Sequence, residues 1–252
     1  MIRFQGVHKA FGPKVVLSGL DLVIPDQQTT VVLGYSGTGK SVMLKLICGL
    51  LQPDQGEIVV DERVVHELGR DELMALRRNI GFVFQFAALF DSMTVAENIR
   101  LGLARQGLEP ETIEARIRES LALVDLAGSE DVYPAELSGG MRKRAGIARA
   151  IALRPGYILY DEPTTGLDPV TAAVIDQLIL RTQQELGVTG VVVTHDLRSA
   201  FTVGQRLAML YQGVIRQVGS VDEMRNSEDP VVRQFLEGRP DGAATPDSMV
   251  PQ

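Results

Sequence analysis

The chain has 252 residues, of which 45% are hydrophobic and 23% are charged, and its formal net charge is −7. This composition is typical of a globular chain long enough to bury a sizeable core, and it excludes the fibrous and disordered classes. The acidic balance argues against a protein whose main task is to hold nucleic acid, since such proteins present a basic face to phosphates. The single cysteine, Cys48, precludes an internal disulfide and favours a reducing compartment, where we expect it to be a small buried hydrophobic residue.

The first sixty residues are rich in strand signals. Turns are expected at Gly12-Pro13 and at residues 53–56. The N-terminus lacks a charged-then-apolar secretory pattern, and no stretch approaches the roughly 18 consecutive apolar residues of a membrane span. We therefore expect any work at a membrane to go through another chain. The β-type runs of this part are residues 2–7, 20–24, 29–33 and 56–60.

Residues 34–41 form a glycine-rich loop of the pattern G-x-x-x-x-G-K-[ST], between a β-type run and a helix expected over residues 41–51. Its glycines leave backbone N–H groups free to close around a β-phosphate, Lys40 supplies a positive charge near the β- and γ-phosphates, and the Ser41 hydroxyl can ligate Mg²⁺. An accidental glycine-rich turn is the alternative, but it leaves the flanking strand and helix unexplained. The predicted nucleotide-binding residues of this phosphate loop are Gly34, Tyr35, Ser36, Gly37, Thr38, Gly39, Lys40 and Ser41.

Apolar residues take up a helical period between about residues 94 and 153, with Pro110 suited to the first turn of one helix. A helical insertion is the simplest account. The periodic positions are Ile113, Ile117, Leu121 and Val124. The densest basic run of the chain follows, and a helical surface with its cations in water explains it about as well as a ligand does. Its members are Arg142, Lys143, Arg144 and Arg149.

Strand signals then return and alternate with helix signals, which predicts parallel strands covered by helices. Asp168 and Pro169 are typical of an N-cap and first-turn pair, and Gly187 can end that helix. Asp229-Pro230 begins a further short helix, and residues 239–252 form a polar tail expected to lack structure of its own. The β-type runs are residues 157–160, 191–194 and 207–211, and a hairpin is expected at Gln212-Gly213 after the last of them.

The strand at residues 157–160 ends in two carboxylates, Asp161 and Glu162. Asp161 at the carboxyl end of a parallel strand suits Mg²⁺ beside a phosphate loop. Glu162 can orient and deprotonate the attacking water, so it is the candidate general base. An exposed acidic turn would be the better interpretation if no phosphate loop preceded it.

A second segment of small residues, Leu137-Ser138-Gly139-Gly140-Met141, precedes a helix-like run and offers N–H groups to an anion. Together with the phosphate loop, Gln85, the two carboxylates, Gly166-Leu167-Asp168 and His195, it follows the motif order of the ATP-binding cassette (ABC) family, which the sequence resembles over nearly its whole length. The resemblance implies an α/β fold, in which a P-loop NTPase core with a mostly parallel sheet carries an antiparallel β edge. A helical signature lobe over about residues 86–153 would be inserted in a single domain spanning residues 1–238.

The resemblance also implies roles for four residues outside the phosphate loop. Gln85 would sense Mg²⁺ and the attacking water, and His195 would act as the switch that responds to the γ-phosphate. Ser138 and Gly140 of one subunit would contact the γ-phosphate held by a second copy. Two ATP molecules would then be enclosed in a head-to-tail dimer.

Further nucleotide contacts are implied for Gly139, Asp168 and Phe11. The family often has tyrosine where this chain has Phe11, whose ring can still stack on adenine but offers no hydroxyl. Met141 replaces the commoner glutamine after L-S-G-G and removes a polar contact to the opposing nucleotide.

Two short segments, residues 84–95 and 137–144, resemble the ATPase subunit of Mla/Mce-type phospholipid transporters. That likeness implies ATP and Mg²⁺ as ligands, a place on the cytoplasmic face of the bacterial inner membrane, and an integral-membrane permease as partner. A Mce-domain lipid-binding protein and a small STAS-domain subunit are further partners in that group. No nucleic-acid partner is expected.

Alternatives to the lipid-transport interpretation remain open. Only the two short segments distinguish a lipid-transport ATPase from an ABC ATPase that serves another substrate. A soluble ABC ATPase acting on ribosomes or DNA usually carries two cassettes or a long coiled-coil insertion, and neither is visible in the sequence. The apolar segment 86–95 can offer a groove to a permease helix, with ordinary packing between the lobes as its alternative.

Overall fold

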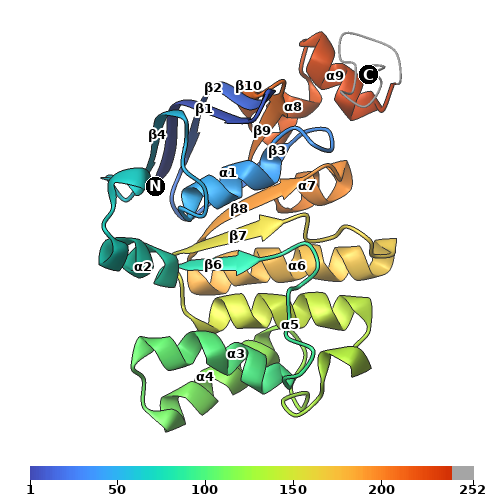
Figure 1. Ribbon diagram of the computed structural model, residues 1–252. Helices are drawn as coiled ribbons and strands as arrows, with labels where there is room; N and C mark the ends of the chain where they lie inside the picture. The colour runs from blue at the N-terminus through green and yellow to red at the C-terminus, as the bar shows by residue number, and fades with distance from the viewer. Residues whose placement is uncertain (240–252) are drawn as a thin grey trace. The chain divides into compact units, whose positions relative to one another are not determined.

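The computed structural model describes residues 1–239, so that the predicted tail lies almost wholly outside the described residues (Figure 1). The chain forms two compact units, one of Met1–Leu68 together with the segment that begins at Val193, the other of Gly69–Val192. The first unit carries the phosphate loop and His195, and the second carries the predicted helical lobe. Across residues 1–239, every helix is too short or too polar to span a bilayer.

In the first unit, an antiparallel sheet has the strand order β2-β1-β4-β5. The turn at Gly12-Pro13 lets the first two strands pair as a hairpin out to Phe11 and Lys14. The strands predicted at residues 2–7 and 20–24 are therefore parts of longer ones. The bounds are β1 Ile2–Phe11, β2 Lys14–Ile24, β4 Gln55–Val60 and β5 Arg63–Val64.

The same unit contains a second group of strands, in which β3 pairs in parallel with β9 and β9 pairs antiparallel with β10. The predicted hairpin at Gln212-Gly213 is confirmed. The predicted helix over residues 41–51 is too long, because the chain turns into the left-handed region at Gly49 (φ 63°). The bounds are β3 Thr29–Leu33, β9 Arg206–Tyr211, β10 Val214–Gly219, α1 Lys40–Ile47, η1 Val65–Glu67, α7 Leu197–Val203, α8 Val221–Arg225 and α9 Pro230–Glu237.

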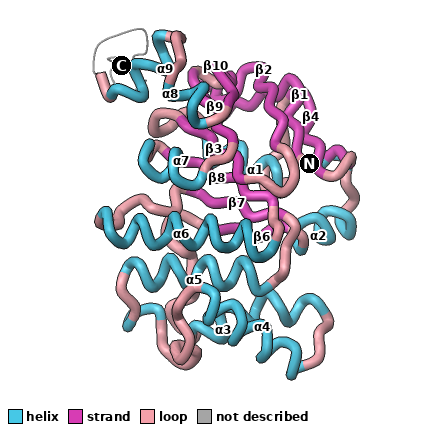
Figure 2. Tube along the Cα trace, turned by 180° about the vertical axis from the view of Figure 1, so that it is seen from behind, coloured by secondary structure: helices cyan, strands magenta, loops and turns pink. Residues whose placement is uncertain are grey.

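In the second unit, β8, β7 and β6 are neighbours, and β6 runs parallel to β7. Helix α5 lies between α6 on one side and the pair α3 and α4 on the other (Figures 1 and 2). Helices α3, α4 and α5 lie within residues 94–153, where a helical period was predicted, while α2 and β6 had no sequence prediction. The bounds are α2 Arg70–Arg78, β6 Ile80–Val83, α3 Val95–Leu103, η2 Ala104–Gln106, α4 Pro110–Leu123, η3 Pro134–Glu136, α5 Gly139–Ala152, β7 Tyr157–Asp161, α6 Pro169–Leu186 and β8 Thr189–Thr194.

Helix ends follow the predicted signals. The Asp168 carboxylate accepts hydrogen bonds from two backbone N–H groups of the first turn of α6, and Gly187 ends that helix in the left-handed region. Asp229 caps α9 in the same way. Cys48 is buried, as predicted. With its parallel strands, antiparallel sheet and covering helices, the predicted α/β class is confirmed.

Candidate ATP and magnesium sites

The phosphate loop connects the buried strand β3 to α1 and depends on two tightly placed glycines. Gly39 precedes the helix with φ 103°, and a Cβ there would lie 2.6 Å from Cγ1 of Val16. A Cβ on Gly34 would lie 2.6 Å from the carbonyl oxygen of Leu210, on β9. Side chains at these positions would push the loop away from the strands beneath it, so glycine is required on steric grounds.

Lys40 lies inside this loop. Its side chain is buried, and Nζ donates hydrogen bonds to the carbonyl oxygens of Gly34 (2.8 Å) and Tyr35 (2.9 Å). The Thr38 hydroxyl also donates to the Tyr35 oxygen, at 2.9 Å. Ser41 follows in the first turn of α1, where N–H groups and the helix dipole favour an anion. The loop therefore brings a cation, a hydroxyl and a helix N-terminus together, as phosphate binding requires.

A cavity of about 380 Å³ opens beside the phosphate loop. Val15 and Val16 of β2 give it an apolar side, which suits the base or sugar of a nucleotide. Phe11, the predicted adenine contact, is 47% exposed and pairs across the β1–β2 hairpin with Lys14, which lines this cavity. The lining residues are Lys14, Val15, Val16, Ser18, Gly37, Thr38, Gln212 and Gly213.

Tyr35 of the phosphate loop is packed between two other aromatic rings of the first unit. Its ring lies edge-on to Phe235 of α9 with a centroid separation of 4.9 Å, and to Tyr211 of β9 at 6.4 Å. Burial raises the pKa of the Tyr35 hydroxyl, with a further contribution from Tyr211. Helix α9 thus supports the loop from a position almost 200 residues later in the sequence, which no local pattern predicts.

In the second unit, β7 ends at Asp161, and Glu162 follows with φ 48°, which is uncommon for a residue with a side chain. Both carboxylates are buried. The Thr165 hydroxyl donates a hydrogen bond of 3.0 Å to Oε2 of Glu162. A buried carboxylate held by a neighbouring hydroxyl has a defined direction, which a general base needs.

Gln85 follows β6 and begins a loop that the helix α5 holds in place. Nζ of Lys143 donates hydrogen bonds to the carbonyl oxygens of Gln85 and Glu162. Burial lowers the pKa of the Lys143 ammonium, while the negative charges of Glu162 and Asp161 oppose that shift. The interpretation of this lysine as a solvated surface cation was wrong, because only 6% of it is exposed.

The segment at residues 137–140 leads into α5. Ser138 is its N-cap, accepting a hydrogen bond of 3.2 Å from the N–H of Met141. Gly140 packs so closely on α6 that a Cβ would lie 2.4 Å from Cγ2 of Thr171. Thr171 also donates a hydrogen bond to the Asp168 carboxylate, and this bond is the main cause of the lowered pKa of Asp168. Thr171 therefore connects Gly140 of the segment 137–140 with Asp168 within this unit.

His195 follows β8 and is exposed. The next residue, Asp196, caps α7, and its own N–H donates a hydrogen bond to the Thr194 hydroxyl oxygen (3.0 Å). Fixed residues on both sides hold the histidine at the end of a buried strand, in the first unit with the phosphate loop.

Comparison with known proteins decides the family. The ABC transporter family model matches residues 17–165. The chain is 42% identical over 239 residues to the probable ribonucleotide transport ATP-binding protein mkl of Mycobacterium tuberculosis, covering 94% of this chain and 67% of the relative. The chain belongs to the ABC transporter family. It is an ATPase subunit with ATP as substrate and Mg²⁺ as its metal.

Other ABC relatives agree with this assignment. The methionine import ATP-binding protein MetN of Bradyrhizobium diazoefficiens is 40% identical over 243 residues, covering 94% of this chain and 70% of the relative. Among solved structures, the cassette MJ0796 in a dimeric post-hydrolysis state bound to ADP and Pi has a TM-score of 0.79 and 35% identity, covering 88% of this chain and 99% of that one. The cbiO1 cassette from Clostridium perfringens has a TM-score of 0.83 and 27% identity, covering 95% of each chain.

The residues predicted for Mg²⁺, taken one by one, have suitable donor chemistry. Within residues 1–239 no group of three or more His, Cys, Asp or Glu side chains could hold a metal. Mg²⁺ is usually bound through one or two protein oxygens together with substrate phosphates. The Ser41 hydroxyl, the Asp161 carboxylate and the Gln85 amide are oxygen donors of that kind.

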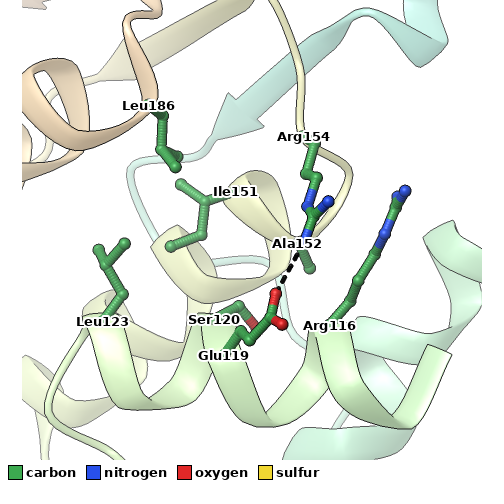
Figure 3. Close-up of a pocket in the computed structure, with 8 residues that line it drawn as sticks. All are labelled: Arg116, Glu119, Ser120, Leu123, Ile151, Ala152, Arg154 and Leu186. Carbon is green, nitrogen blue, oxygen red and sulfur yellow. Dashed lines mark hydrogen bonds and ion pairs between the residues drawn. The ribbon is translucent and has the colours of Figure 1, made fainter. Parts of the chain in front are cut away.

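A further cavity of the ABC ATPase, of about 230 Å³, lies in the second unit and is separate from the predicted site residues. Figure 3 shows Arg154 reaching toward Glu119, with a hydrogen bond of 2.9 Å, and Arg116 standing beside this pair. On the other side of the pocket the lining is apolar, with Leu123, Ile151 and Leu186 to the left of this pair in the view. The lining residues are Arg116, Glu119, Ser120, Leu123, Ile151, Ala152, Arg154 and Leu186.

Sequence reasoning missed two supports of the site, Lys143 and the Tyr35–Phe235 contact. Lys143 had a detectable signal, because it lies three residues after Gly140 and four before Ile147, in the buried stripe of α5. Phe235 had none, since it comes close to the phosphate loop only through the fold.

Proposed function

We propose that this ABC ATPase drives phospholipid transport across or between bacterial membranes, attached to an integral-membrane permease on the cytoplasmic face of the inner membrane. Its relatives are named for different substrates: one for ribonucleotide transport and the other for methionine import. Support for a lipid comes from the two segments around Gln85 and Met141, which resemble the Mla/Mce group. In that group Mce-domain and STAS-domain proteins are further partners.

In the proposed cycle the phosphate loop binds ATP, with Phe11 stacking on the base and Lys40 countering the phosphate charge. Glu162 deprotonates the attacking water, which His195 and Gln85 help to place. Mg²⁺ would supply positive charge to offset that of the phosphates. The phosphate loop would hold the nucleotide, Asp161 and Gln85 would offer oxygen ligands to the metal, and Glu162 would receive the proton.

We propose a second copy of the chain as partner, with Ser138 to Gly140 of each copy contacting the γ-phosphate bound by the other. The N-terminus of α5 is suited to this, since Ser138 and Gly139 are exposed and N–H groups lie in its first turn. The dimeric post-hydrolysis structure of MJ0796 supports such an arrangement. Closure with ATP and release after hydrolysis would be the useful output.

Exposed apolar side chains on the second unit support a permease contact. Phe86 is 85% exposed and Phe90 is 58% exposed, while the buried side chain of Asn98 bonds to both backbone groups of Phe90 and so fixes its position. A cavity of about 470 Å³ nearby offers room for a helix. It is lined by Ser92, Met93, Glu97, Arg100, Leu101 and Ala104.

Purification from the native membrane, followed by identification of co-eluting polypeptides and lipids, tests the whole proposal. We expect a permease and phospholipid, with ATPase activity of the reconstituted complex stimulated by phospholipid. Stimulation by methionine or a ribonucleotide and not by phospholipid would instead support the function named for one of the relatives.

The permease contact has a separate test. Leu89→Glu and Phe90→Glu should reduce co-purification of the permease, whereas Val23→Glu, at a site 46% exposed on β2 of the other unit, should leave it unchanged. All three variants should still bind ATP. Undiminished co-purification with both loop variants would reject this surface.

A further inference from the structure

The loop that begins at Gln85 has an unusual backbone. Ala87 and Ala88 are both in the left-handed region, with φ of 59° and 51°. Residues with a Cβ avoid this region, and two in succession persist only when surrounding groups hold them. The loop therefore depends on contacts outside its own sequence.

Helix α5 supplies these contacts from three positions one turn apart. Lys143 donates from Nζ to the carbonyl oxygen of Gln85, and Arg149 donates from its guanidinium to those of Ala88 (2.5 Å) and Ala87 (2.8 Å). Between the two cations lies Gly146, where a Cβ would be 3.3 Å from the Cβ of Ala87. A single helix thus binds three carbonyl groups of the loop and leaves room for its close approach.

Lys143 has a second acceptor, the carbonyl oxygen of Glu162, at 3.2 Å. Glu162 is itself in the left-handed region, so its peptide is also held against a local preference. One ammonium group therefore connects the backbone of Gln85 with that of Glu162. Because the ammonium is buried, these charge-assisted bonds are shielded from competing water.

We propose that Lys143 is a positioning residue for ATP hydrolysis, which sets the direction of the Glu162 side chain by fixing its peptide against the Gln85 loop. Arg149 holds the turn at Ala87 and Ala88 through their carbonyl oxygens. The inference rests on the proposed role of Glu162 as general base. It adds that the helix beginning at Ser138 is linked to both loops through this one side chain.

The test compares Lys143→Met, which keeps the length of the aliphatic part of the side chain but removes the ammonium, with Arg144→Met. Arg144 belongs to the same helix and also donates to backbone carbonyls, those of Val124 and Asp125, which lie outside the two loops. For each variant we would measure kcat, KM, the Kd of a non-hydrolysable ATP analogue with Mg²⁺, the thermal midpoint, and hydrogen exchange of the amides in residues 84–88.

Lys143→Met is expected to lower kcat by about tenfold or more, since misdirecting a general base forfeits part of its contribution of 10²–10⁴. The Kd of the analogue should change by less than about twofold, and exchange in residues 84–88 should become faster. Arg144→Met should leave both kcat and this exchange near the wild-type values, even if its thermal midpoint falls. Equal losses of kcat in the two variants, or an unchanged kcat in Lys143→Met, would overturn the proposal.

If Lys143→Met does not fold, Lys143→Gln decides, because its side chain is one bond shorter and uncharged, so the polar group is kept but the two charge-assisted carbonyl contacts are expected to be lost. Lower kcat with an unchanged Kd in the folded Gln variant supports the proposal, and wild-type kcat with wild-type exchange rejects it. Exchange in nucleotide-free protein reports on the loop whatever group acts as base. A failure of Glu162 in its proposed role is therefore separable from a failure of Lys143.

Discussion

The phosphate loop of the first unit and the Gln85 loop of the second are held by different means. In the phosphate loop, positive φ values fall on glycines, and Lys40 donates to carbonyls of its own segment. In the Gln85 loop, positive φ values fall on alanines, and the stabilising cations come from a helix about sixty residues later.

The difference separates local from long-range control of a functional loop. A loop with glycine at its left-handed positions can adopt its conformation without strain. A short sequence pattern therefore identifies it. A loop that keeps strained alanines needs the folded protein around it, so no short pattern in its own residues identifies it.

Glu162→Gln should give the largest effect. It tests whether a residue of the second unit is needed for ATP hydrolysis but not for ATP binding. Replacing the proposed base should lower kcat by about a hundredfold or more, while ATP still binds. A closed, ATP-loaded dimer should accumulate, detectable by size-exclusion chromatography with ATP and Mg²⁺. Turnover at the wild-type rate would remove Glu162 from the role of base.

Gly39→Ala should weaken ATP binding, in contrast to Glu162→Gln, because it distorts the phosphate loop. The new Cβ would meet Val16, and the residue would keep a left-handed conformation, at a combined cost of about 1–3 kcal/mol. We expect the Kd for ATP to rise by about tenfold or more and the thermal midpoint to fall. Gly37→Ala is the matched control, since its φ is also positive but nothing lies within 4 Å of the added Cβ. Equal effects of the two substitutions would mean that contact with Val16 is unimportant.

Phe235→Ala tests whether the phosphate loop also has a long-range support. Loss of an aromatic contact worth about 0.5–1.5 kcal/mol should raise the Kd for ATP between about twofold and tenfold, with little change in kcat. Titration with a fluorescent ATP analogue measures this. Val232→Ala, which truncates another buried side chain of α9, controls for loss of packing in the helix. A Kd that rises no more in the Phe235 variant than in this control argues against the support.

The smallest effect is expected at Asp168, through pH. Hydrogen bonds, chiefly from Thr171, lower the folded-state pKa of Asp168, so its contribution to stability is present above the usual aspartate pKa of about 3.9 and is lost as pH falls through the folded value. Asp168→Asn should lower the thermal midpoint at pH 7, and the gap to the wild type should narrow as pH is reduced from about 5 to 3. A gap that stays constant over this range would assign the effect to geometry and not to charge.

Much of the fold could be predicted because its signals are local. A contiguous β-type run marked the buried strand β3, and Asp168 with Pro169 marked the start of α6. Boundaries were less accurate where pairing or a turn decided them. The β1–β2 hairpin extended strands beyond their apolar runs, and Gly49 ended α1 early.

The sequence by itself determined which chemical groups this ABC ATPase possesses, since the phosphate loop, the two carboxylates after β7 and the small residues before α5 are each contiguous and each follow from backbone requirements. Only the tertiary structure decided what holds them. The burial of Lys143 between two carbonyls and the packing of Phe235 on Tyr35 join residues far apart in the chain. Such contacts arise from the packing of whole helices, and a local pattern carries no information about them.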